Sequence, residues 1–374
     1  MAWDWNASGR IDDFEFEKIS PKDLETKLGD LEGVVGGTLT YSYFSSLKVS
    51  GQLQIINAKS SMAEDEYLIR IWYCPRMTPD GTPKRIELGT FYFSANLKYE
   101  NNVYSGNIDL RSCLARHIDD VIPTKLVLKA GKTKDALWKN MFKVLGGKYE
   151  IINMKPYTKK KNKIFAAGTP VMEVLEYIAK MGSDCEITVN SHGKTVLQNY
   201  ETPQTKAKNI KHTLIADEKS VVRTVLDISN SLKEIPNRAV FAYEETKTET
   251  YQKNGKTKTK HTSVTHLGKA TLSSKHARSH AKINRWITHY EKVDECEKAK
   301  VGGYSANLKK MAKSYLKRNN IKYTYYEFEC FYQPIELGEV IRFTYGDMNI
   351  KGMVTNIDLS LEVGAKMRVK VRKV

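Results

Sequence analysis

The sequence predicts a mainly β protein with α/β insertions. Three observations predict this class. Segments with alternating apolar residues, separated by turn signals at intervals of about 8–12 residues, fill the first third of the chain. Two amphipathic helical patterns follow between residues 133 and 182. Strand-like alternation then returns from residue 221 and continues to the end of the chain, interrupted by one further helical pattern.

The first predicted domain, residues 1–120, is a β domain. Between residues 36 and 56, Leu47, Val49, Leu53 and Ile55 occur at even spacing, which is the period of a half-buried strand. Further strands are expected over residues 67–74 and 85–97. The segment 112–120, SCLARHIDD, predicts one short helix.

An α/β domain is predicted over residues 121–215. A strand at 125–131 precedes a helix that begins after Thr133, ends at Gly146-Gly147 and buries Leu137, Met141, Val144 and Leu145. A second helix begins at Thr169-Pro170, with proline in the first helical position, and ends at Gly182. A hairpin over residues 185–200 completes the unit.

The second β domain is predicted to comprise residues 216–245 and 322–374, with a hairpin-plus-helix insertion at 246–321. Asn254-Gly255 predicts a two-residue hairpin turn, because both turn positions require a positive φ. Residues 303–319 predict a helix capped by Ser305, with a buried stripe of Leu308, Met311, Ala312, Tyr315 and Leu316. In the last strand Met367, Val369 and Val371 alternate with Arg368, Lys370 and Arg372, which predicts one buried and one basic face.

The charge balance suggests an anionic partner. The chain has 374 residues, with 60 Lys and Arg against 43 Asp and Glu, for a net charge of +17. Nucleic acid, an anionic cell surface or an acidic protein would suit this excess, and a solvated lysine-rich surface is the alternative. The charges are spread along the sequence, with dense runs at 159–161 and 256–260, where loops are expected.

Cysteine usage and the amino terminus fit a protein that folds in a reducing cytoplasm. The five cysteines are far apart, and none occurs in a CxxC pair, so a zinc ribbon, a redox motif and a disulfide framework are all disfavoured. The first residues do not form a secretory signal, and no segment approaches the ~20 apolar residues of a membrane span.

Motifs that carry catalysis are absent from the sequence. His276 and His280 have the spacing of two ligands on one helix face, but no third ligand or HExxH glutamate accompanies them, so surface histidines are favoured. Cys113 and His117 are also four apart, and a buried core thiol is favoured over a nucleophile. Neither a phosphate-binding glycine loop nor a GxSxG elbow occurs. We therefore expect a protein that is not an enzyme and needs neither cofactor nor metal.

Several segments, taken in order, resemble the central tail hub of phages. This family includes the hub of contractile-tail baseplates and the N-terminal hub module of siphophage tail-associated proteins. The segments are GTLTYSYFSSLKVSGQLQI, LIRIWYC, IELGTFYFSA, SCLARHIDD, AAGTPVMEVLEYIAKMGSDCEITVNSHGKTVLQNYETP, IPNRAVFAY, INRWITHYE with Arg285, and PIELGEVIRFTY with IKGMVTNIDLSLEVGAKMRVKVR.

The resemblance implies a fold of two small β-barrels with α/β and helical elaborations. It also implies a homotrimer whose six barrels form a pseudo-sixfold ring in the virion tail, assembled in the host cytoplasm. Expected partners are the chain itself, a distal tail ring protein, a tape-measure protein and receptor-binding or fibre proteins, with transient DNA passage. The chain stops at Val374, shortly after the last strand. If it is complete, any lytic activity is expected elsewhere, whereas a truncated chain that has lost a C-terminal lysin or fibre would look the same.

The candidate functional residues are basic side chains and a hairpin tip. The candidate interface or lumen residues are Arg368, Lys370, Arg372, Lys159, Lys160 and Lys161. For the first three we expect a subunit or partner interface, because a strongly basic lumen would hold passing DNA. Asn254 and Gly255 mark the tip of a possible docking arm. A basic nucleic-acid-binding protein is the alternative function. A cell-wall hydrolase is a third possibility, but it lacks a recognisable catalytic constellation.

Overall fold

The chain divides into two compact units in the computed structural model. The first unit comprises Met1–Ile228 and Tyr325–Val374, and the second comprises Ser229–Thr324. The structure describes residues 11–59, 62, 64, 66–76, 84–182, 185–216, 222–231, 236–253, 256–294, 296, 298–319 and 323–374.

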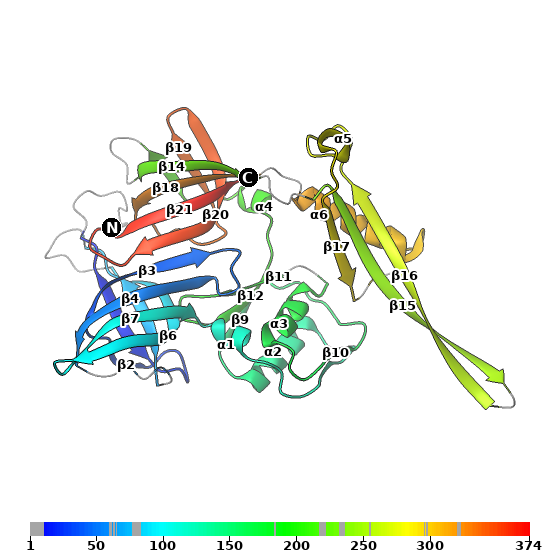
Figure 1. The fold of residues 1–374 in the computed structure, drawn as a ribbon, viewed down its shortest axis with the longest axis horizontal. Helices are drawn as coiled ribbons and strands as arrows, with labels where there is room; N and C mark the ends of the chain where they lie inside the picture. Colours follow the sequence, from blue (N-terminus) through cyan, green and yellow to red (C-terminus); the bar gives the residue numbers. More distant parts are fainter. Residues whose placement is uncertain are drawn as a thin grey trace. The chain divides into compact units, whose positions relative to one another are not determined.

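A large, mostly antiparallel sheet dominates the first unit (Figure 1). One half comes from the N-terminal region: β1 (Phe14–Ile19), β2 (Lys27–Asp30), β3 (Val34–Ser42), β4 (Val49–Ala58), β5 (Leu68–Tyr73), β6 (Ile86–Glu100) and β7 (Val103–Ser112). The other half comes from later segments: β13 (Thr213–Ala216), β14 (Val222–Ser231), β18 (Tyr323–Phe331), β19 (Val340–Tyr345), β20 (Met348–Ser360) and β21 (Lys366–Lys373).

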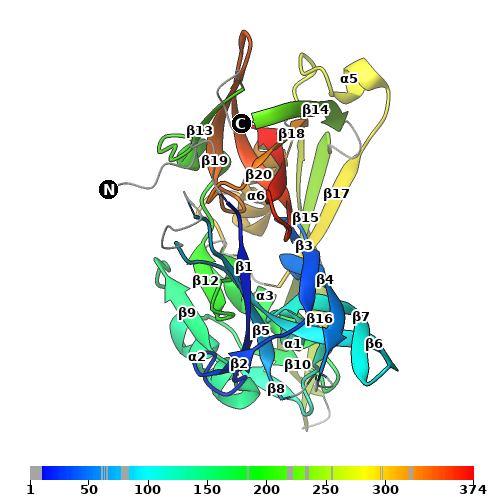
Figure 2. The same cartoon turned by 90° about the vertical axis from the view of Figure 1, so that its left-hand side faces the viewer.

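The two halves are joined edge to edge. The strand order is β14-β18-β21-β20-β3-β4-β7-β6-β5-β1-β2, with β19 beside β20 and β13 beside β19. Figure 2 shows β1, β2 and β5 towards one end of this arrangement and β14, β18 and β19 towards the other. The junction is the antiparallel pairing of β3 with β20, from Ser42 opposite Asn356 to Thr38 opposite Ser360.

A single hydrophobic core spans the junction. Leu39 and Leu53 of the N-terminal half belong to the same buried cluster as Phe328 and Val369 of the C-terminal half. Burial of this much apolar surface is the main favourable term in folding, so the two halves stabilise each other. The predicted mainly β class is confirmed, and the shared sheet and core are additional features that the sequence did not predict.

The α/β region packs around its own core within the first unit. Its elements are α1 (Ala115–Asp119), β8 (Leu126–Leu128), α2 (Lys134–Leu145), β9 (Tyr149–Ile152), β10 (Lys163–Phe165), α3 (Val171–Lys180), β11 (Cys185–Val189), β12 (Thr195–Asn199) and α4 (Pro203–Lys206). As predicted, Thr133 caps α2 by accepting a hydrogen bond from the amide of Ala136. The predicted stripe of α2 is wrong at Val144, which is 76% exposed near the helix end.

The second unit contains a three-stranded sheet covered by one helix. Its elements are β15 (Arg238–Lys253), β16 (Lys256–Thr271), α5 (His280–Ile283), β17 (Thr288–Val293) and α6 (Gly303–Asn319). Phe241 of β15 packs in one cluster with Leu308, Ala312 and Leu316 of α6. Gly268 lets the helix approach closely, since a Cβ there would lie 2.2 Å from backbone atoms of α6.

Two sequence expectations about this unit require correction. Residues 238–245 were predicted to lie in the second β domain, whereas β15 pairs with β16 and β17 in a separate sheet. Alternation identifies a strand but does not specify its partner strand, which explains the error. Helix α6 also begins at Gly303, two residues before the predicted cap Ser305, and Met311 of its predicted stripe is 37% exposed.

Candidate assembly surface

The basic row predicted in the last strand lies on one face of β21. Met367, Val369 and Val371 are buried, with at most 1% of each residue exposed. Arg368 is exposed and Lys370 is half-buried, as expected for side chains that alternate across a strand. The alternation therefore gives β21 one buried apolar face and one charged face.

Acidic side chains of the neighbouring strand β18 compensate this row. Glu327 contacts both Arg368, through Nε, and Lys370, whose Nζ lies 3.9 Å from Glu327 Oε2. Lys366 Nζ lies 3.9 Å from Glu329 Oε1. The row is thus an ion-pair network across two strands rather than a bare positive stripe. Exposed pairs of this kind contribute little stability and are better suited to specifying a neighbour.

The charged face of β21 continues, through polar side chains of β20 and β3, across the junction between the two halves. Arg368 lies opposite Asp358 of β20, and Asp358 lies opposite Thr40 of β3. Thr40 Oγ1 donates a hydrogen bond of 2.8 Å to Asp358 Oδ1. Thr38, Glu329, Asp358, Ser360, Lys366 and Arg368 line a shallow groove on this face. Both halves therefore contribute to one polar surface.

Arg372 and the lysine run 159–161 occupy different environments. The Arg372 guanidinium lies 5.7 Å from the centre of the Phe44 ring. Lys159 is only 1% exposed, and its Nζ donates a hydrogen bond of 2.7 Å to the Tyr177 hydroxyl. Its prediction as an interface residue is therefore wrong, because the side chain is already buried within the α/β region. Lys160 and Lys161 are exposed, and the structure does not place these two beside the row on β21.

The predicted hairpin is formed by β15 and β16, which pair continuously from Arg238 opposite Thr271 to Lys253 opposite Lys256. Its predicted tip, Asn254-Gly255, lies outside the described residues. His276 and His280 do not share a helix, because α5 begins at His280. His280 instead stacks on Trp286, with ring centres 4.3 Å apart. Among the described residues, no cluster of three or more His, Cys, Asp or Glu could hold a metal ion.

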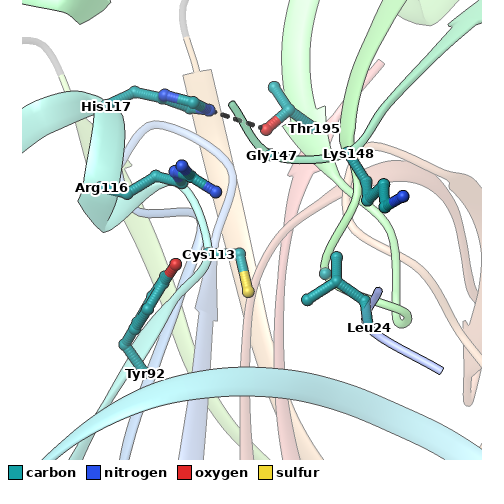
Figure 3. A pocket seen from close by; sticks show the side chains of 9 residues that line it. Leu24, Tyr92, Cys113, Arg116, His117, Gly147, Lys148 and Thr195 are labelled. Atoms are coloured by element: carbon teal, nitrogen blue, oxygen red, sulfur yellow. Dashed lines mark hydrogen bonds between the residues drawn. The ribbon is translucent and has the colours of Figure 1, made fainter. Parts of the chain in front are cut away.

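A small pocket lies where the N-terminal half of the sheet meets the α/β region (Figure 3). His117 of α1 and Thr195 of β12 are hydrogen-bonded across it, with 3.1 Å between Nε2 and Oγ1. Arg116 donates a hydrogen bond to the carbonyl of Leu145. These two contacts tie α1 to β12 and to the end of α2 at a buried joint.

Cys113 and His117 both line this pocket but do not form a catalytic pair. The Cys113 thiol donates to the carbonyl of Thr90 at 3.4 Å. Burial raises the pKa of Cys113 to about 12, and burial together with the nearby Arg116 charge lowers the pKa of His117 to about 4. The thiol therefore stays protonated and the imidazole stays neutral near pH 7, so the predicted core thiol is confirmed.

A second polar joint was missed by the sequence analysis. Glu87 of β6 lies 2.8 Å from Arg70 of β5 and 2.8 Å from His192, in the turn between β11 and β12. The Arg70 and Glu87 side chains are only 7% and 8% exposed. Arg70 also donates to the carbonyl of Leu24. An arginine inside the apolar run LIRIWY was the signal in the sequence that could have revealed this ion pair.

We expect Glu87→Ala to destabilise the first unit by about 3 kcal/mol, because it leaves the Arg70 charge buried without its carboxylate partner. Urea unfolding at pH 7 measures this loss. Glu25→Ala is the matched control, since Glu25 forms only an exposed contact with Lys194, and it should cost less than about 1 kcal/mol. Equal losses of stability in the two variants would contradict the assignment of Arg70 and Glu87 as a buried ion pair.

The joint at His117 should be sensitive to acid. Its folded-state pKa lies below the ordinary value of 6.5, so protonation favours the unfolded chain and stability falls as pH drops from about 6.5 towards 4. We expect His117→Gln to remove about 2–3 kcal/mol of the acid-induced loss between pH 7 and 4.5, measured by urea unfolding. His276→Gln, in the second unit, is the control. A pH dependence that is the same in His117→Gln and wild type would rule out this role.

The similarity of the chain to known proteins lies in its fold. No protein-family model matches the sequence, and no curated protein is similar to it. Among solved structures, a tail protein from Neisseria meningitidis MC58 aligns over 96% of this chain and 97% of its own, with a TM-score of 0.64 and 10% identity. The 43 kDa tail protein of prophage MuSo2 from Shewanella oneidensis aligns over 96% of both chains, with a TM-score of 0.60 and 11% identity.

A third structure extends this similarity to a Gram-positive source. The prophage tail protein gp18 from Listeria monocytogenes EGD-e aligns over 98% of this chain and 94% of its own, with a TM-score of 0.50 and 9% identity. Each alignment covers at least 96% of this chain. The resemblance inferred from the sequence is therefore confirmed for the architecture: the chain has the fold of phage tail proteins.

Proposed function

We propose that this protein is the structural central hub of a phage or phage-like tail tip. In this role it forms a homotrimeric ring with pseudo-sixfold symmetry, joins the tail tube or distal tail ring to the tip, and gates the DNA path. The observation that carries the proposal is the fold shared over nearly the full length of three tail proteins, two of them from prophages. The joined sheet supports it, because three subunits whose two β halves take equivalent places would supply six positions around an axis.

The proposed hub acts by assembly and has no catalytic role. Its partners would be its own copies, a distal tail ring protein, a tape-measure protein and receptor-binding or fibre proteins, and it would reside in the virion tail. We propose two β-barrel domains within the joined sheet, one formed by each half. The hairpin of β15 and β16 is a candidate docking arm for one of the partners.

Within this proposal the charged row on β21 belongs to a subunit or partner interface. Its cations are matched by Glu327 and Glu329, and it lies on a surface to which both halves contribute. Such a network can exchange partners with a neighbouring subunit at little net cost. Electrostatic matching of this kind sets register and specificity more than affinity.

The alternative function is a basic nucleic-acid-binding protein without enzymatic activity. The net charge of +17 favours it. The two functions differ in their state of assembly, because the hub requires a closed oligomer and the alternative does not.

We expect the purified chain to have a mass of about 128 kDa by light scattering after size exclusion, three times the 42.7 kDa of the monomer. Substituting Arg368→Ala and Lys370→Ala should weaken the assembly and shift the mass towards 42.7 kDa in dilute protein. The matched control is Lys98→Ala with Lys129→Ala, which removes two exposed cations elsewhere in the first unit.

Two results would count against these assignments separately. A wild-type monomer at all concentrations, with or without 0.5 M salt (~4 Å Debye length), would contradict the self-assembling ring. A trimer that survives the Arg368 and Lys370 substitutions unchanged would contradict only the assignment of the β21 row to the interface.

A further inference from the structure

The positive charge of the chain is concentrated in the second unit. Residues 229–324 contain 21 Lys and Arg against eight Asp and Glu, for a net charge of +13, whereas the whole chain carries +17. The first unit, although nearly three times longer, therefore carries only +4. The sequence analysis treated the charge as spread along the chain, because the boundaries of this compact unit were not known. A field of this density around a small unit attracts polyanions.

One stretch of the second unit contains no acidic residue. From Thr250 to Tyr290 the sequence has seven Lys, two Arg and five His but neither Asp nor Glu. Lys275, Lys282 and Arg285 in and beside α5 are exposed. No carboxylate within the stretch can therefore neutralise these cations, unlike the row on β21.

Hydrogen bonds to a buried asparagine hold the segment that carries these cations. Asn237 is 1% exposed, and its Nδ2 donates to the carbonyls of Arg278 at 3.1 Å and Arg285 at 2.7 Å. Its Oδ1 accepts from the amide of Ile287 at 2.9 Å. Helix α5 itself buries no residue. The segment around α5 is therefore held in place by hydrogen bonds, and it contributes exposed basic side chains but few buried ones. We call it the platform.

Trp286 organises the cations of this platform. His280 stacks on its ring at 4.3 Å, and the Arg238 guanidinium lies 4.8 Å from the ring centre. Lys269 Nζ is 6.0 Å from the same ring. These cation–π contacts restrict the arginine and lysine before any ligand binds. His280, Arg238 and Lys269 thus surround a tryptophan that is still 41% exposed.

The long helix of the unit adds a second set of cations. Lys309, Lys310, Lys313 and Lys317 are exposed on α6, which contains no acidic residue. Leu308, Ala312 and Leu316 hold its other face against the sheet. These lysines lie on the α6 side of the sheet, whereas Arg238 and Lys269 alternate with Ala239 and Ala270 of the α6 core and therefore lie on the other side.

We propose that the second unit binds the phosphate backbone of duplex DNA without sequence specificity. The inference goes beyond the hub function and does not depend on ring formation. Lys275, Lys282 and Arg285 would contact phosphates, while Trp286 positions Arg238 beside them. Binding of this type releases counterions and weakens steeply with salt.

The test measures fluorescence anisotropy of a labelled 20-base-pair duplex with the full chain. Non-specific binding should have a Kd of about 10⁻⁴–10⁻⁶ M at physiological salt, falling markedly at lower salt. The variant Lys275→Glu/Lys282→Glu/Arg285→Glu should weaken binding by at least about tenfold at low salt and reduce the slope of log K against log salt by about 3.

The matched control is Lys98→Glu/Lys129→Glu/Lys143→Glu, which makes the same change of charge on exposed residues of the first unit. It should weaken binding by less than about threefold. Equal losses in the two triple variants would overturn the proposal, since net charge alone would then explain binding. Wild-type binding weaker than about 10⁻³ M at physiological salt would also overturn it.

Two further probes distinguish other ligands. A single strand of equal length should bind no more tightly than the duplex, and tighter binding would contradict the assignment of the ligand as duplex DNA. A poly-glutamate chain with as many charges as the duplex should bind more weakly. If it binds as tightly or more tightly, the surface is suited to an acidic protein and the DNA assignment fails.

Discussion

The pairing of β3 with β20 is the constraint on which the first unit depends. These strands are more than 300 residues apart in sequence, and their five paired positions join two β regions into one sheet. The pairing also closes a common core, in which the ring centres of Tyr73 and Tyr332, from opposite halves, lie 4.1 Å apart. A free edge on either strand would expose unpaired backbone groups and the apolar face behind them. The two halves are therefore expected to fold and unfold together, and a ring built from this chain would contain one rigid β body per subunit.

Much of the local structure followed from the sequence, whereas long-range pairing did not. The cap at Thr133, the buried stripe of Val171, Val174, Leu175 and Ile178, and the alternation of β21 were predicted because they depend on neighbouring residues. The β3–β20 junction and the transfer of β15 to a separate sheet depend on which strand is the partner, and periodicity does not encode this. Lys159 was misjudged for a related reason: a lysine in a basic run resembles a surface residue until the Tyr177 hydroxyl that binds it is located.

The two units use charge in different ways. In the first unit, cations are paired with carboxylates, both in the buried contact of Arg70 with Glu87 and on the exposed row at Glu327. In the second unit, Lys275, Lys282 and Arg285 lie in a stretch without acids, and a buried asparagine holds the backbone of this segment. A surface whose cations are paired with carboxylates is suited to binding one particular protein neighbour. A surface whose cations lack nearby carboxylates is suited to binding a polyanion. An assembly module and a separate basic module within one chain account for both patterns.

Electron cryomicroscopy of the purified chain tests the central claim most directly, because it measures symmetry as well as copy number. The account predicts closed rings with threefold symmetry, in which the two halves of each joined sheet alternate around the axis to give six similar positions. Rings of another symmetry, open filaments, or isolated subunits at high protein concentration would contradict the assignment of this chain as a self-assembling tail hub.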